Sequence, residues 1–138
     1  MSSRTKARKR AVDALYAAEL RDVMATDLLE VTRDQVADRQ NQDEIFDFAT
    51  QLVTGVLANQ IEIDEILAGV AQNWTLDRMP ALDKAILRVG IYEIAYSATP
   101  SEVAISEAVD LAQELSTEDS PAFINGVLAT VSATRRPI

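Results

Sequence analysis

Hydrophobic residues recur along most of the chain three to four positions apart, and the alternation typical of strands is nearly absent. This spacing predicts a first helix over residues 4–20, where Val12, Leu15, Tyr16 and Leu20 form an apolar stripe. The same pattern predicts helices over residues 43–59, 61–73, 82–96, 100–115 and 120–133, with a weaker candidate over residues 26–36.

Residues that favour helix starts support these positions. Asn41 is followed three residues later by Glu44, which is the spacing of a capping box, and Ser120 precedes Pro121, a residue favoured in the first helical turn. The helix over residues 82–96 is apolar on nearly every side, which is typical of the buried centre of a bundle. We therefore expect an all-α fold, a single domain over residues 1–138 with about seven helices in two small helical bundles. The bundles are expected over residues 4–73 and 74–134, with Trp74 at their junction.

Two glycines, Gly90 and Gly126, lie within expected helices. Glycine inside a helix costs roughly 1 kcal/mol relative to alanine. We interpret both as places where another helix passes closely.

The composition is globular and lacks several parts that catalysis commonly uses. Hydrophobic residues make up 48 % of the 138 residues, and there is no cysteine and no histidine. No glycine-rich phosphate loop is present, so we expect neither an enzyme nor a bound cofactor or metal. The sequence shows no signal peptide and no run of about 20 apolar residues, which predicts a cytoplasmic protein without a membrane span.

Charge is distributed very unevenly. Of the 13 Lys and Arg residues, five lie in the stretch RTKARKR, residues 4–10, which holds no acid; the other eight share the remaining chain with all 22 acidic residues. Cations at a helix N-terminus oppose the macrodipole by about 0.3–1 kcal/mol each. A bound phosphate backbone would offset this repulsion, whereas a solvated basic N-terminus is the simpler interpretation. On a helical wheel the five cations wrap around the helix: Arg4, Lys6, Arg8, Lys9 and Arg10.

Two aromatic residues are candidates for stacking on a nucleic-acid base. Tyr16 shares the apolar stripe of the first helix, which favours core packing. Phe123 lies about 90° from the apolar face of the last helix, where a ring suits either packing or stacking. Asp119, just before that helix, suits either the positive end of the helix dipole or a base amino group.

Three segments together resemble the NusB family of transcription antitermination factors, and its actinobacterial members in particular. The resemblance covers residues 4–20 and 74–131 with order and spacing kept, whereas residues 21–73 agree only in helical character. The segments are ARKRAVDALYAAEL, WTLDRMPALDKAILRVGIYEIAY and VAISEAVDLAQELSTEDSPAFINGVL.

The resemblance implies a protein that binds the boxA element of ribosomal RNA leader transcripts together with NusE, a ribosomal protein of the small subunit. The pair would act in the RNA polymerase antitermination complex and support ribosomal RNA transcription. NusE docking is implied around Asp83 and Glu93 of the central helix. RNA contacts are implied for Arg4, Lys6, Arg8, Lys9, Arg10, Tyr16, Asp119 and Phe123.

The sequence departs from the family pattern near the expected RNA site. Thr5 stands where many relatives have another Arg, and Asp13 stands where Gln is usual. Three other interpretations stay open at this point: a protein-only helical adaptor, a homodimer with weak RNA binding, and the first domain of a ribosomal RNA cytosine methyltransferase.

Overall fold

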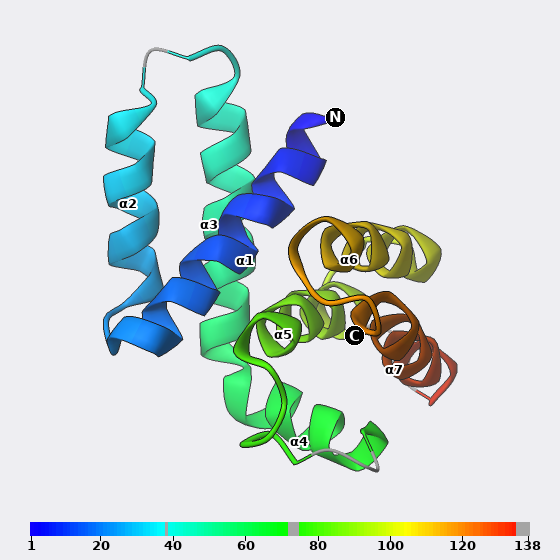
Figure 1. Ribbon diagram of the computed structural model, residues 1–138. Helices are drawn as coiled ribbons and strands as arrows, with labels where there is room; N and C mark the ends of the chain where they lie inside the picture. The colour runs from blue at the N-terminus through cyan, green and yellow to red at the C-terminus, as the bar shows by residue number, and fades with distance from the viewer. Residues whose placement is uncertain (38, 72–74, 135–138) are drawn as a thin grey trace.

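The computed structural model describes residues 1–37, 39–71 and 75–134, and over these residues the chain forms seven helices and no strand (Figure 1). The helix ends predicted from the sequence agree with those of the structure within one residue, except that the helix expected over residues 61–73 ends at Val70. Trp74 lies outside the described residues. The helices are α1 (Ser3–Arg21), α2 (Ala25–Gln35), α3 (Gln42–Ala58), α4 (Gln60–Val70), α5 (Ala81–Tyr96), α6 (Ser101–Leu115) and α7 (Ser120–Thr134).

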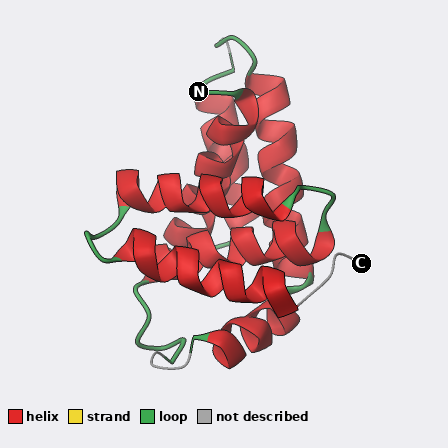
Figure 2. Ribbon diagram, turned by 90° about the vertical axis from the view of Figure 1, so that its right-hand side faces the viewer, coloured by secondary structure: helices red, strands yellow, loops and turns green. Residues whose placement is uncertain are grey.

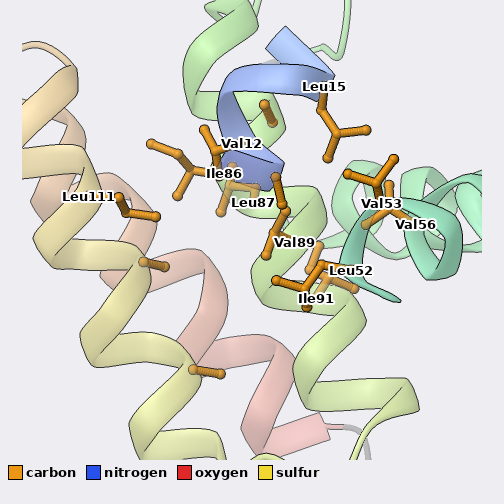
Figure 3. Packing of buried hydrophobic residues seen from close by; sticks show 14 of the residues in the cluster. Val12, Leu15, Leu52, Val53, Val56, Ile86, Leu87, Val89, Ile91 and Leu111 are labelled. Atoms are coloured by element: carbon orange, nitrogen blue, oxygen red, sulfur yellow. The ribbon is translucent and has the colours of Figure 1, made fainter. Parts of the chain in front are cut away.

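Helix α5 is the centre of the fold, as its all-round apolar sequence predicted. It packs against α1, α3, α4, α6 and α7. Its side chains Ile86, Leu87, Val89 and Ile91 are buried and meet residues of α1 and α3 (Figure 3). Ten of its sixteen residues are buried, including two acids, Asp83 and Glu93.

The other helices are arranged around α5 in two directions. Helices α2 and α3 stand side by side, and α1 crosses them, while α5, α6 and α7 lie across that direction (Figures 1 and 2). Helix α4 packs against α5 and α7. The buried hydrophobic residues form one cluster to which every helix contributes. The boundary between two bundles at residues 73 and 74 stays a prediction.

The helix starts differ from the sequence expectation at Asn41. Its backbone is left-handed, with φ of 64°, and its side chain makes no capping hydrogen bond. A capping side chain needs an extended backbone at that position, so the predicted capping box with Glu44 is wrong. Ser120 is the first residue of α7, and its buried hydroxyl donates to Asp83 Oδ2 over 2.9 Å.

The two glycines singled out in the sequence differ in their surroundings. A Cβ on Gly90 would lie 2.8 Å from Leu128 Cδ1, so the predicted close crossing of α5 and α7 is confirmed. The prediction for Gly126 is wrong, because no atom of another described helix lies within 4 Å of a Cβ placed there. Gly55 in α3 has the closest approach of the four glycines: a Cβ placed on it would lie 2.2 Å from Tyr92 Cε1.

A buried ion pair joins α1 to α5. Arg8 is 4 % exposed and Glu93 1 %. Arg8 Nε donates to Glu93 Oε1 over 2.7 Å, and its Nη2 donates to Glu93 Oε2 over 2.9 Å. A third bond, from Nη1 to Glu107 Oε1 over 3.3 Å, reaches α6. This two-pronged geometry is the strong form of an arginine–carboxylate contact, and it fixes α1 at one position on α5.

We expect Gly55→Ala to lower the free energy of unfolding by about 1–3 kcal/mol, because the added methyl overlaps the Tyr92 ring. Gly69→Ala in α4 is the matched control: no described atom lies within 4 Å of the new Cβ, so this change should raise the free energy of unfolding by up to about 1 kcal/mol. Urea unfolding followed by circular dichroism measures both. Equal stability of the two variants would contradict the packing of Tyr92 on α3.

Removing one partner of the buried pair, by Arg8→Met or Glu93→Leu, should cost about 3–5 kcal/mol, because the other charge is left buried and unpaired. The double variant should cost less than the sum of the single variants. Arg33→Met is the control, since Arg33 pairs with the exposed Asp43 and Asp47 and should cost less than about 1 kcal/mol. Urea unfolding of the wild type, the two single variants and the double variant measures the coupling, and additive single effects would contradict it.

Candidate nucleic-acid interface

The five cations of residues 4–10 are not equivalent in the folded chain. Arg8 is buried, with all its contacts inside the fold. Burial lowers the pKa of its guanidinium, but the hydrogen bonds and charge of Glu93 and the charge of Glu107 outweigh this effect, so the pKa stays above its ordinary value. The expectation that Arg8 contacts RNA does not fit this placement, because its hydrogen-bond donors already face Glu93 and Glu107.

The other four cations remain accessible along α1. Arg4 and Lys6 are exposed, and Lys9 and Arg10 are half-buried. The Arg4 guanidinium lies 4.1 Å from the centre of the Phe48 ring, and that of Arg10 lies 5.5 Å from the centre of the Phe46 ring. The guanidinium groups thus pack over two aromatic rings of α3. Sequence reasoning missed this role, although both aromatic residues stand out in the segment EIFDFAT.

Three of these cations line one hollow in the surface. Lys6, Lys9 and Arg10 lie on one face of α1, opposite residues of the connection between α2 and α3. Asp13 belongs to the same face. It is exposed, yet neighbouring atoms displace water from its carboxyl; this desolvation raises the pKa of Asp13 and outweighs the opposing charges of Lys9 and Arg10. The hollow, called here the basic hollow, is lined by Met1, Lys6, Lys9, Arg10, Asp13, Arg39, Gln40, Gln42 and Ile45.

The other predicted RNA-contacting residues lie on α1 and at the start of α7. Tyr16 and Phe123 are half-buried, and both rings pack against the hydrophobic core. Asp119 is exposed directly before α7. Their roles toward RNA stay predictions.

Polar contacts near the end of α6 involve α1 on one side and the start of α7 on the other. Lys9 Nζ lies 2.6 Å from Glu114 Oε1, near the end of α6. Just beyond, Ser116 Oγ donates to Asp83 Oδ1 over 2.6 Å and lies 2.9 Å from Ser120 Oγ. The first turn of α7 is thus held at the end of α6 that touches α1.

The expected docking residues for NusE are inside the protein. Asp83 is 4 % exposed and accepts hydrogen bonds from Ser116 and Ser120. Glu93 is buried against Arg8. The expectation that Asp83 and Glu93 themselves contact NusE does not fit this burial. Docking around these positions of α5 stays a prediction.

The described residues contain no group of three or more His, Cys, Asp or Glu side chains placed to hold a metal ion. Over the same residues, no helix combines the length and the apolar character needed to cross a membrane.

Comparison with known proteins agrees with the resemblance seen in the sequence. The NusB family model matches residues 5–133. The transcription antitermination protein NusB of Clavibacter michiganensis subsp. michiganensis is 48 % identical over 136 residues, which are 98 % of this chain and 99 % of that protein. The crystal structure of T. maritima NusB superimposes with a TM-score of 0.85 at 27 % identity, over 99 % of this chain and 95 % of that one.

A second structural neighbour is a crystal structure of the antitermination factors NusB and NusE in complex with dsRNA. It has a TM-score of 0.82 at 23 % identity, with 96 % of this chain and 98 % of that chain covered, and shows the shared fold. The family model and the full-length curated relative together establish that the chain belongs to the NusB family.

Proposed function

We propose that this protein is a transcription antitermination factor that binds boxA RNA together with NusE and acts within the RNA polymerase antitermination complex. It works in the cytoplasm by binding and not by catalysis. Membership of the NusB family supports this assignment. The observation that carries the RNA-binding part is the set of accessible cations on α1 in a chain of net charge −9: Arg4 near its start, and Lys6, Lys9 and Arg10 on one face.

The charge pattern suits an RNA partner for a physical reason. Where accessible cations cluster, they neutralise phosphates of a polyanion and release its counterions, which favours binding. Elsewhere the negative surface repels it, so RNA is confined to the vicinity of α1. Proteins recognise unpaired RNA bases by stacking and hydrogen bonding. Phe123 and Tyr16 are the rings that the sequence proposes for stacking.

NusE is the proposed protein partner. One structural neighbour was crystallised with NusE and dsRNA, and it shares this fold. Asp83 and Glu93 contribute indirectly, because they hold α7 and α1, respectively, on α5. The acidic remainder of the chain suits a basic partner, whose approach it would accelerate.

The alternative function is a protein-only helical adaptor, or a homodimer with weak RNA binding. The acidic Asp13 in the middle of the cationic face favours this alternative, since it repels phosphate. Titration with boxA RNA and with a scrambled RNA of equal length, each with and without NusE, separates the two. Stronger binding of boxA, tightened further by NusE, supports the proposed function; equal, weak binding of both RNAs with NusE present contradicts it.

Lys6→Ala/Arg10→Ala should weaken boxA binding about tenfold or more and reduce the slope of log K against log salt by about 1.4, since each lost phosphate contact removes about 0.7. The control is Arg21→Ala/Arg78→Ala, which removes two exposed arginines outside residues 4–10. Fluorescence anisotropy at several salt concentrations measures both slopes. Equal slopes for the two double variants would contradict a specific role of the cations in residues 4–10.

Asp13→Gln should strengthen RNA binding severalfold, because it removes the only carboxylate that lines the basic hollow among the described residues. The gain should shrink at high salt, where charges are screened. Glu30→Gln, an exposed acid on α2, is the control for the change in net charge. The same anisotropy titration measures the effect; unchanged affinity of Asp13→Gln would place RNA away from this face.

A further inference from the structure

The basic hollow extends the cationic face of α1 to a part of the chain that the sequence left unassigned. Its volume is about 430 Å³, within the range of small-ligand sites of about 300–1,000 Å³. One wall is α1, with Lys6, Lys9 and Arg10. The other wall comes from the connection between α2 and α3, with Arg39, and from the start of α3, with Gln42. This wall lies at the same end of the molecule as the N-terminus (Figure 1).

The electrostatics of the hollow favour an anion. Four cations line it, Lys6, Lys9, Arg10 and Arg39, against one carboxylate, Asp13. Lys9 is partly neutralised by Glu114, and Lys6 and Arg39 are exposed. A negatively charged group therefore meets a net positive wall with two long, accessible cationic side chains.

Gln42 contributes a buried hydrogen-bond acceptor without a partner in the described part of the chain. Its Nε2 donates to the backbone oxygen of Gln40 over 3.2 Å, and this bond sets the orientation of the amide. Its Oε1 is buried and has no hydrogen-bond partner among the described residues, and it is the only such side-chain atom found there. A buried acceptor without a partner costs about 1–3 kcal/mol, so the site gains from a ligand that supplies a donor.

We propose that the basic hollow binds one unpaired nucleotide of the RNA, with its phosphate at Lys6 and Arg39 and a donor of its base or ribose at Gln42. A nucleotide has the two groups that complement the hollow: an anionic phosphate for its cations and a nearby N–H or O–H donor for the Gln42 acceptor. A carboxylate side chain of an acidic protein supplies the charge but leaves the Gln42 acceptor unpaired. Ile45, which is 3 % exposed, is the apolar side chain of α3 that lines the hollow. This inference rests on the proposed RNA binding and adds the connection between α2 and α3 to the interface.

The test compares Arg39→Ala and Gln42→Leu with wild type and with Arg78→Ala, an exposed arginine in the segment before α5. Anisotropy with boxA RNA should show roughly three- to tenfold weaker binding for each of the two hollow variants, from the loss of one contact each. Only Arg39→Ala should lower the salt slope, by about 0.7. Arg78→Ala should match wild type.

Stability separates a binding role of Gln42 from a structural one. Gln42→Leu keeps a similar side-chain volume and removes the unpaired acceptor, so its urea midpoint should equal or exceed that of wild type while RNA binding weakens. A direct readout is photo-crosslinking with RNA that contains 4-thiouridine: mass spectrometry should place crosslinks within residues 39–45 and 1–10, and Gln42→Leu should reduce those in the first range.

The outcomes distinguish this inference from the proposed function. If wild type binds boxA RNA and both hollow variants bind it equally well, the hollow is not a nucleotide site, although RNA binding stands. If wild type binds poly-glutamate as tightly as RNA and both variants lose both ligands equally, the hollow is a general anion site and the inference is overturned. If wild type binds no RNA even with NusE, the proposed function fails and this inference with it.

Discussion

The bidentate pair between Arg8 and Glu93 is the contact on which the arrangement of this protein depends. It joins the first helix to the central helix, and through Glu107 it reaches α6. Because both charges are out of water, the pair is stable only while both partners are present in this geometry. The pair therefore specifies where α1 lies on α5, and the position of α1 decides which of its cations face solvent.

Fixing α1 divides the basic stretch by function. On a helical wheel that starts at Arg4, Arg8 lies at about 40°, close to Leu15 at about 20° and Val12 at about 80°, whereas Lys9, Lys6 and Arg10 fall between about 140° and 240°. The first direction points into the core and the second lines the basic hollow. One arginine thus stabilises the fold, and its neighbours are left to meet an anionic partner. Asp13, at about 180°, moderates the positive charge of that outer face.

Most of the fold follows from periodicity, because each helix buries one apolar face and α5 buries nearly all of its surface. The pairing of buried polar groups did not follow. The signal for Arg8 was present, since it lies one turn before Val12 on the apolar stripe, but a pattern of charges on one helix does not reveal Glu93 on another. Asp83 and Glu93 were expected at a surface for the same reason. The capping box at Asn41 failed because the backbone there is left-handed.

The proposed function requires that RNA contacts the outer cations of α1 while Arg8 remains in the core. Two-dimensional NMR of the arginine Nε–Hε groups, recorded during titration with boxA RNA, tests this directly. The signals of Arg4, Arg10 and Arg39 should shift with added RNA, and the Arg8 signal, held by Glu93, should stay at its position throughout. A shift of the Arg8 signal with no change at Arg4, Arg10 and Arg39 would contradict this account.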